Sequence, residues 1–583
     1  MRILLALMIG AVGYAQIPAQ DSRNTEIPNT DFHFTARPYK TLAEWQARRE
    51  HLRKQVLSAT GLMPMLPKND LHPQIFGKIE NRTYSIEKVL IETLPGYYLG
   101  GNLYRPMKTP PPGGFPAIVS PHGHWQYGRL EHSAVASVPA RCISLAQQGY
   151  IVFAYDMVGY NDTIQTPHAF GGPREQLWDF GPLSLQLWNS IRAVDFIESL
   201  PGVNHARIGA TGASGGATQT LLLEAVDDRI TYSAPVNMVS AIMQGGDFCE
   251  NAPNLRLDTF NVEIASIMAP RPMILVSATG DWTKNTATEE FPAVRAIYEL
   301  YDKAANVETV HLDAPHNYNQ QNREAVYRFF GKHVLGESDP ALFKERNIRL
   351  EKLQDMLALH NRKLPDNALD YDGVAALWIR MAQERASSVN DRAQAREMLE
   401  LALGAEWPER ATTDATGETI LFARPVRGDR VAGHLRQGAG RKILFVHPEG
   451  ADAARKSAEY AALARTGRPL YTIDAFQTGS AVAPRNRDAK MFLTFNRSDD
   501  ANRVQDILTV LRALDSDVEL VGTGKAAVWC QFAAALARRP VSLKADLGSF
   551  TGSDQDYVER FFVPGIQRAG GLRAARLLTE NKN

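Results

Sequence analysis

A serine between small residues at 212–216 constrains the fold of this chain more than any other feature. The segment reads Gly-Ala-Ser-Gly-Gly, with Ser214 at its centre. The apolar stretch 207–211 before it is typical of a buried strand, and 217–225 after it is typical of a helix. A turn this tight admits only small neighbours and lifts the serine hydroxyl clear of the sheet. The pattern predicts a nucleophilic serine at the start of a helix.

Strand-like and helix-like segments alternate on both sides of this turn. Apolar runs at 116–121, 150–156, 230–236, 272–278 and 308–312 predict strands, and 87–106 predicts edge strands around a Pro-Gly turn. Helical patterns at 183–199 and 287–304 separate them, and a further helix is expected within 40–75. Such alternation predicts an α/β fold with a doubly wound, mostly parallel sheet.

Composition narrows the classes of partner. The sequence has 44% hydrophobic and 22% charged residues, as soluble globular proteins do. Lys+Arg and Asp+Glu both number 64, so no broad field would attract nucleic acid or an anionic membrane. We therefore expect a small or neutral substrate and no nucleic-acid partner. The oligomeric state is left open.

The N-terminus has the pattern of a targeting segment. Met1-Arg2 supplies a positive start, 3–12 is an apolar run, and Gly13-Tyr14-Ala15 is a small-x-small cleavage site. The apolar run is short for a membrane span. We predict a signal peptide at 1–15, no membrane anchor after its removal, and a secreted or periplasmic protein.

A length of 583 residues implies more than one domain. The first domain is expected at 16–335, with its N-terminal helical extension. Residues 336–410 are helical and highly charged, which indicates a helical linker or a small subdomain. The remaining residues, 411–583, are expected to form a second α/β domain.

This second domain resembles an incomplete copy of the first. Residues 442–450 are similar to 117–124, and 471–476 are similar to 152–157. Residues 518–527 correspond to the serine turn, but Gly524 stands where Ser214 does. The sequence reaches Asn583 without counterparts of the strands at 272–278 and 308–312. We therefore expect a truncated, degenerate and non-catalytic domain.

A serine nucleophile requires a base and a group that orients that base. In a fold with this turn, the acid and then the histidine follow the serine along the chain. Asp281 follows the strand 272–278, and His316 follows the strand 308–312. We predict a Ser214, Asp281, His316 triad. Asp247 and Glu250, which follow the strand 230–236, are the alternative acids.

Backbone N–H groups would stabilise the tetrahedral intermediate. Gly215 offers one such donor, and the loop 121–125 offers another at His124, where Gly123 allows close approach. Trp125, Trp282 and Tyr318 are candidates for a substrate wall, although core packing is the commoner role of such residues.

Cysteine and histidine spacing gives no metal motif. Cys142, Cys249 and Cys530 form no C-x-x-C pair. A Cys142–Cys249 bridge and buried free thiols are both compatible with the sequence. His122 and His124 lie two apart, but no third ligand is evident, so we expect no metal site and no cofactor.

Five motifs, in order, are similar to those of the acetyl xylan esterase-like α/β-hydrolases of secreted bacterial proteins. They are SPHGHW at 120–125, AYDMVGYND at 154–162, GPLSLQLWNS at 181–190, GATGASGGATQT at 209–220 and SAPVNMV at 233–239. The resemblance spans about residues 40–335. It implies an α/β-hydrolase fold and cofactor-free hydrolysis of carbohydrate esters, with Ser214, Asp281 and His316 as nucleophile, acid and base.

The resemblance also bears on the substrate. The chain lacks the Arg-Gly-Lys run that follows the serine in the neighbouring glucuronoyl esterases, which favours acetyl esters over uronate esters. The leading hypothesis is a secreted serine esterase acting on acylated polysaccharide or its oligomers. A peptidase of the prolyl-oligopeptidase kind is a second hypothesis, but no propeller-like array of strands precedes the first domain. A non-catalytic carbohydrate-binding homologue is a third.

Overall fold

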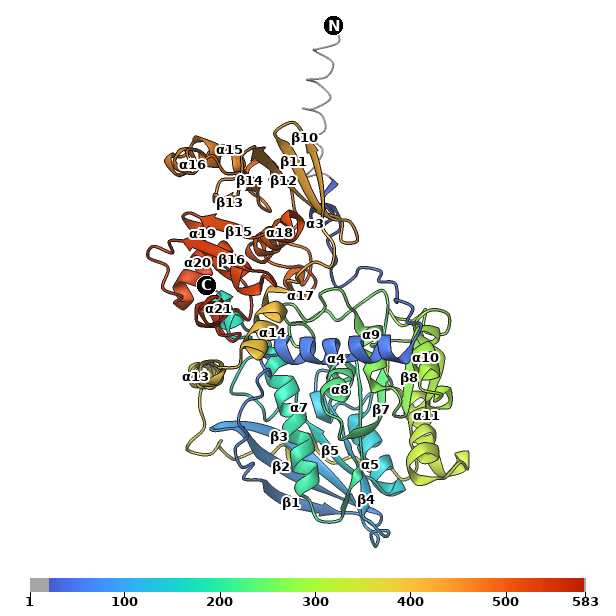
Figure 1. The fold of residues 1–583 in the computed structure, drawn as a ribbon. Coiled ribbons are helices and arrows are strands. Elements are labelled where there is room, and N and C mark those ends of the chain that lie inside the picture. The colour runs from blue at the N-terminus through green and yellow to red at the C-terminus, as the bar shows by residue number, and fades with distance from the viewer. Residues whose placement is uncertain (1–19, 581–583) are drawn as a thin grey trace. The chain divides into compact units, whose positions relative to one another are not determined.

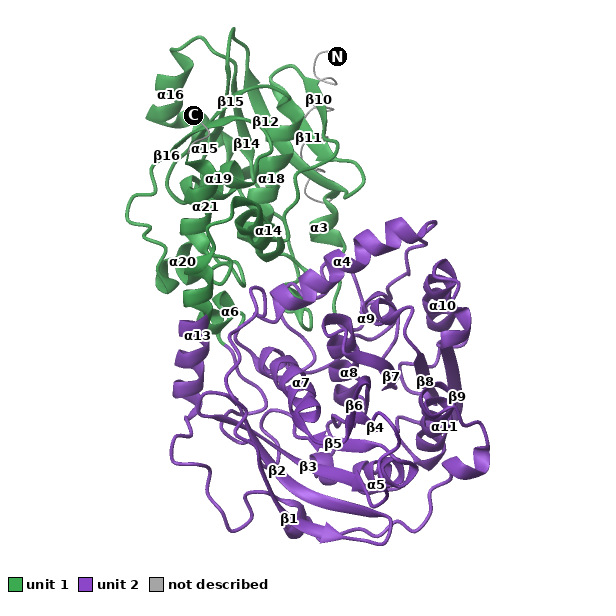
Figure 2. Cartoon of the chain, turned by 60° about the horizontal axis from the view of Figure 1, so that its bottom comes forward, with its two compact units in different colours: residues 1–29, 172–179, 382–583 green, residues 30–171, 180–381 purple. Residues whose placement is uncertain are grey.

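The structure is a computed structural model that describes residues 20–580, coloured from blue to red along the chain in Figure 1. The predicted signal peptide at 1–15 lies outside these residues. The described part divides into two compact units, shown in Figure 2. Of the described residues, unit 2 comprises 30–171 and 180–381, and unit 1 comprises 20–29, 172–179 and 382–580.

Unit 2 contains a mixed sheet with strand order β1-β2-β3-β5-β4-β6-β7-β8-β9. The antiparallel strands are β1 (Gln74–Glu80), β2 (Tyr84–Leu94) and β3 (Tyr97–Pro106), and β3 pairs antiparallel with β5 (Ile151–Tyr155). The remaining pairings are parallel. They join β5, β4 (Phe115–Val119), β6 (Val203–Ala213), β7 (Ile230–Val236), β8 (Met273–Gly280) and β9 (Val307–Pro315).

Helices cover both faces of this sheet. Side chains of β5 alternate between two buried clusters: Phe153 and Tyr155 lie in one, Val152 and Ala154 in the other. The first cluster also contains side chains of α4 (Leu42–Ala59), α7 (Pro182–Ser199), α8 (Gly215–Val226) and α10 (Glu290–Leu300). The second contains side chains of α5 (Val138–Gln148) and α11 (Gln320–Phe330). This burial on both faces explains the continuous apolar runs of the sequence.

The predicted N-terminal helix is α4. A capping box starts it, because the Thr41 hydroxyl accepts from the Glu44 N–H while the Glu44 carboxylate accepts from the Thr41 N–H. Trp45, Leu52 and Val56 of this helix belong to the core of unit 2. The helix therefore packs on the main sheet as expected.

Unit 1 contains a second sheet, with strand order β10-β11-β12-β14-β13-β15-β16. Its strands are β10 (Thr412–Thr416), β11 (Thr419–Arg424), β12 (Asp429–Arg436), β13 (Lys442–Val446), β14 (Leu470–Asp474), β15 (Val518–Gly522) and β16 (Val541–Ala545). Its longer helices are α14 (Arg392–Leu403), α18 (Asp499–Leu514), α19 (Lys525–Leu536) and α21 (Gly571–Thr579).

The strand order of this sheet repeats that of β1 to β7. The turn between β15 and α19 also repeats the serine turn: Gly524 has φ 53° and ψ −133°, and Ser214 has φ 58° and ψ −126°. The predicted α/β fold class, with a mostly parallel sheet in the first domain and a smaller second sheet domain, is confirmed. The sheet of unit 1 has three antiparallel and three parallel strand pairings. Descent of unit 1 from a copy of the first domain stays a prediction.

The boundaries of the two units differ from those predicted at 335/336 and 410/411. Residues 336–381 group with unit 2, because Val374 and Trp378 of α13 (Tyr371–Ser388) are buried in its core. No separate subdomain forms between residues 336 and 410.

Residues 172–179, which include α6 (Pro173–Leu177), group with unit 1. The Gly565 N–H donates to the Gln176 carbonyl, and Arg568 pairs with Asp179 at 2.6 Å. Both ionic side chains are buried, and burial raises the pKa of Asp179 to about 6 against the lowering effect of Arg568. The two partners are 389 positions apart, so no local pattern indicated this grouping.

None of the helices between residues 20 and 580 combines the length and apolar character that a membrane crossing requires.

Candidate active site

Ser214 lies between β6 and α8 in a strained backbone conformation. Its φ of 58° and ψ of −126° fall in a region that residues with a side chain rarely occupy. Its N–H donates to the Val236 carbonyl at the end of the neighbouring strand β7. This conformation places the half-exposed serine at the N-terminus of α8.

Backbone crowding explains the glycines of this turn. A Cβ added to Gly212 would lie 2.5 Å from the Gly216 carbonyl oxygen. A Cβ added to Gly216 would lie 2.8 Å from the carbonyl oxygen of His122, in the loop after β4. Real Cβ atoms do not approach backbone oxygens this closely, so the turn and the loop require glycine at both positions.

Asp281 and His316 form a close pair at the carboxyl edge of the sheet. The His316 Nδ1 lies 2.8 Å from the Asp281 Oδ2. The Asp281 side chain is 1% exposed, and that of His316 is 23% exposed. Because the carboxylate only accepts, Nδ1 carries the proton and Nε2 presents its lone pair. The pair thus provides an oriented base with its acceptor nitrogen free for another proton.

Hydrogen-bond donors surround both oxygens of the Asp281 carboxylate. Its Oδ1 accepts from the Thr283 N–H at 2.7 Å and from the Thr283 hydroxyl at 2.5 Å. Its Oδ2 accepts from the Asn237 side-chain amide at 2.8 Å, in addition to His316. Asn237, which has φ 54° directly after β7, was not identified from the sequence. Its place directly after the predicted strand 230–236, at the carboxyl edge of the sheet, is the sequence signal that could have indicated it.

Two contacts connect the Ser214 turn with this pair. Ser214 donates to Val236, whose neighbour Asn237 bonds Asp281. The Tyr318 hydroxyl lies 2.8 Å from the Thr211 hydroxyl, which joins the loop of His316 to the strand that ends at Ser214. The three predicted triad residues therefore lie on loops that are tied together at one edge of the sheet.

The His316 ring lies against two indoles. Its centroid is 4.4 Å from that of Trp282 and 6.1 Å from that of Trp125. Within residues 20–580, no hydrogen-bond partner faces the buried His316 Nε2. In the absence of substrate, hydrogen bonds between a base and its nucleophile are often long. The indoles thus flank the imidazole, and their part in a substrate wall stays a prediction.

Tyr318 and the two alternative acids, Glu250 and Asp247, make other contacts. Tyr318 is 1% exposed, with Arg141 4.7 Å above its ring, so burial excludes it from a substrate wall. Glu250 accepts from the Gly246 and Asp247 N–H groups, at 2.7 and 3.2 Å, and does not bond His316. Asp247 lies 3.4 Å from His124 instead. The geometry favours Asp281 over both alternative acids.

The loop after β4 approaches the Ser214 turn closely. A Cβ on Gly123 would lie 2.7 Å from the Ala213 carbonyl oxygen and 3.0 Å from the Ser214 Cβ. Among residues 20–580, no acceptor bonds the N–H of His124 or Gly215. Two free donors beside a nucleophile are what an oxyanion hole requires.

His122, the neighbouring histidine, supports this loop from within the core. Its Nε2 accepts from the Met157 N–H at 2.9 Å, so its Nδ1 donates to the Gly123 carbonyl at 2.8 Å. Burial lowers the pKa of His122 to about 3. The ring is neutral at physiological pH and holds the backbone at Gly123.

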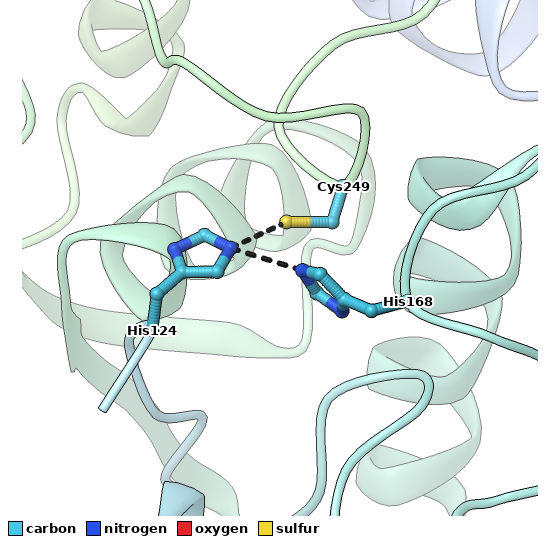
Figure 3. A group of neighbouring side chains, drawn as sticks. All are labelled: His124, His168 and Cys249. Atoms are coloured by element: carbon cyan, nitrogen blue, oxygen red, sulfur yellow. Dashed lines mark hydrogen bonds between the residues drawn. The ribbon is translucent and has the colours of Figure 1, made fainter. Parts of the chain in front are cut away.

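His124 belongs to a second cluster, which sequence spacing did not reveal. Its Nε2 lies 3.1 Å from the His168 Nε2 and 2.9 Å from the Cys249 Sγ (Figure 3). His122, the partner considered from the sequence, does not belong to it. The three residues are separated by up to 125 positions, so only the fold brings them together.

All three cysteines of the sequence lie in the described part of the chain, and all are buried free thiols. The Cys142–Cys249 bridge that the sequence allowed is not formed. Burial raises the pKa of Cys249 well above its usual value.

We expect Gly123→Ala to impair turnover without unfolding the protein. The new methyl group would lie 2.7 Å from the Ala213 carbonyl oxygen, which belongs to the paired strand β6, so we expect the loop and the His124 N–H to shift. Loss of one oxyanion donor lowers kcat by about 10²–10³-fold, and steady-state kinetics on p-nitrophenyl acetate would measure the change. Gly181→Ala, which adds a methyl group in open space, is the matched control. Equal activity of both variants would remove this loop from the site.

Known proteins offer a comparison with this chain. None of the protein-family models matches it. The solved structure of "Methylesterase BT1017" is similar, with 31% sequence identity and a TM-score of 0.52 over 60% of this chain and 78% of that one. "Putative hydrolase YtaP" of Bacillus subtilis is 26% identical over 226 residues, which cover 35% of this chain and 73% of that protein. An acetyl xylan esterase from Paenibacillus sp. R4 is more distant, with 18% identity and a TM-score of 0.33 over 55% of this chain and 99% of that one.

Proposed function

This chain belongs to the α/β-hydrolase esterases, and from that premise we propose that it hydrolyses carbohydrate esters through Ser214, His316 and Asp281. The observation that carries the proposal is the 2.8 Å contact between His316 and the buried Asp281, on loops tied to the strained Ser214 turn. This contact leaves the Nε2 of His316 as the proton acceptor.

In the first half of the reaction, the Ser214 Oγ attacks the ester carbonyl carbon while His316 Nε2 accepts the Ser214 hydroxyl proton. Asp281 keeps the proton on Nδ1 and stabilises the imidazolium that forms. The tetrahedral oxyanion is stabilised by the N–H groups of Gly215 and His124. The alcohol then leaves with the proton from Nε2, and the acyl group remains on Ser214.

In the second half, water takes the place of the alcohol. His316 removes a proton from that water, which attacks the acyl-enzyme through a second tetrahedral intermediate. Its collapse releases the carboxylic acid and returns the proton to Ser214. Each step uses side chains and backbone donors of unit 2 and requires no cofactor.

Two classes of ester fit this chemistry. The sequence favours acetyl esters, in which the sugar is the leaving alcohol. The name of the methylesterase relative supports methyl esters as a second candidate, in which methanol leaves and the sugar acid stays on the serine. We further propose that the protein is secreted, on the evidence of the signal-peptide pattern at residues 1–15.

A release assay tests the proposed function. The full chain is incubated with acetylated xylan, methyl-esterified uronate oligomers and feruloyl esters, and acetate, methanol or ferulate is measured. We expect release from one or both of the first two substrates. p-Nitrophenyl acetate and an aminoacyl-nitroanilide are run in parallel, and cleavage of the anilide alone would favour the peptidase.

Fluorophosphonate labelling separates an enzyme from a non-catalytic homologue. The probe modifies activated serines, so we expect it to label Ser214. We expect unit 1 to stay unlabelled, because Gly524 occupies the position there that matches Ser214. A folded wild-type chain that takes up no probe and releases no product would contradict the proposal.

A further inference from the structure

Three loops bring His124, His168 and Cys249 together (Figure 3). His124 follows β4, His168 follows β5, and Cys249 follows β7. All three strands are in the parallel part of the sheet, so their carboxyl ends lie at the edge that also holds Ser214. The cluster is therefore separate from the triad but adjacent to it.

The ring of His168 is oriented toward the cluster. Its Nδ1 lies 2.6 Å from the Val158 carbonyl oxygen, which can only accept. Nδ1 therefore carries the proton, and the lone pair of Nε2 faces His124 and Cys249. Metal-binding histidines commonly donate their second ring N–H to a carbonyl or carboxylate in this way.

The separations suit a tetrahedral metal site. Zn–N bonds of about 2.0–2.1 Å and Zn–S bonds of about 2.3 Å place tetrahedral ligand atoms about 3.3–3.6 Å apart. The His124 Nε2 lies 3.1 Å from the His168 Nε2 and 2.9 Å from the Cys249 Sγ. To admit the ion, the two nitrogens would move apart by about 0.2–0.3 Å, and the nitrogen and sulfur by about 0.6–0.7 Å. Asp247 lies 3.4 Å from the His124 Nε2 but groups with Glu250 rather than with His168 and Cys249, so water or another exogenous ligand would take the fourth position.

Buried contacts hold all three loops. Arg129, five residues after His124, is fully buried and pairs with both Asp156 and Asp162 on the loop that leads to His168. Gln186 donates to the Cys249 carbonyl at 3.3 Å. The ligand atoms are therefore held close together by the fold, which lowers the cost of assembling the site.

From this arrangement we infer that His124, His168 and Cys249 bind a divalent cation of the zinc class. Two imidazoles and a thiolate are ligands that zinc prefers, whereas magnesium and calcium prefer oxygen. Binding replaces the thiol proton of Cys249 by the metal ion and releases that proton to solvent. The ion links the loop of His124 to the loops of His168 and Cys249. It thereby positions the backbone N–H of His124 beside Ser214.

Cobalt titration of the full chain tests the inference without any ester substrate. The protein is first treated with a chelator and kept under a thiol-free reductant. Co²⁺ bound to a thiolate produces a charge-transfer band in the near ultraviolet. We expect this band to saturate at one equivalent of Co²⁺ and to disappear when Zn²⁺ is added.

Two variants assign the ligands. Cys249→Ala should abolish the band, and His168→Ala should weaken Co²⁺ binding by more than the about 10–100-fold that loss of an outer partner costs. Cys142→Ala, which removes another buried free thiol, is the matched control and should keep the band at full intensity. Circular dichroism verifies that each variant is folded.

Several results would overturn the inference. A folded wild-type chain without a charge-transfer band would show that the cluster is only hydrogen-bonded. A band that persists in Cys249→Ala would assign the metal to other residues. Because neither measurement depends on ester hydrolysis, failure of this inference and failure of the proposed function can be distinguished.

Discussion

Ser214→Ala is expected to lower kcat for p-nitrophenyl acetate by about 10⁶-fold, as loss of the nucleophile does in other serine hydrolases. Without the hydroxyl no acyl-enzyme forms, and the remaining donors can only assist direct attack by water. Ser199→Ala is a suitable control, because the Ser199 hydroxyl lies at the end of α7 and donates to the Phe196 carbonyl of the same helix. Steady-state kinetics and fluorophosphonate labelling measure the effect.

Ser214→Gly separates chemistry from backbone strain. This variant should be as inactive as Ser214→Ala, but its free energy of unfolding should be higher by about 1 kcal/mol, because glycine adopts positive φ without strain. Gly524 already occupies the matching conformation in unit 1. Urea denaturation compares the two variants. An active Ser214→Ala variant would move the nucleophile to another residue.

Asp281→Asn is expected to lower kcat by about 10⁴-fold, the second largest effect that we predict. Both carboxylate oxygens accept from donors, so the amide nitrogen of asparagine faces a donor in either orientation. Opposite His316, that nitrogen would require Nδ1 to accept, which moves the imidazole proton to Nε2. The lone pair needed to deprotonate Ser214 would then be lost.

Glu250→Gln tests the rival assignment of the acid. Glu250 accepts from backbone N–H groups and from Thr218 rather than from His316. We expect its substitution to cost less than about tenfold in kcat, far below the effect of Asp281→Asn. If Glu250→Gln instead caused the larger loss, Asp281 would be a structural residue and Glu250 the acid.

Local patterns predicted much of the fold and of the candidate site. The strands of the parallel sheet, the serine turn and the positions of Asp281 and His316 all follow from segments of a few residues. Such segments are informative because burial on both faces requires continuous apolar runs, and a tight turn requires glycine. The edge strand β1 and the hairpin strands β10 to β12 were missed, since their half-exposed sequences carry no such runs.

Interactions between distant segments were not predictable in the same way. Residues 172–179 group with unit 1 because Asp179 pairs with Arg568, and nothing near either residue indicates the other. The substrate-wall expectation was wrong for Tyr318, because the aromatic ring that suits a surface site also suits the core.

By itself, the sequence determined the α/β class, the tight serine turn and the order along the chain of the residues proposed to act with that serine. The tertiary structure alone decided which carboxylate meets His316, and that His124 meets His168 and Cys249. The physical reason is that turn geometry and strand burial are encoded over a few neighbouring residues. Loop contacts at the edge of a sheet depend on how strands far apart in the chain are paired.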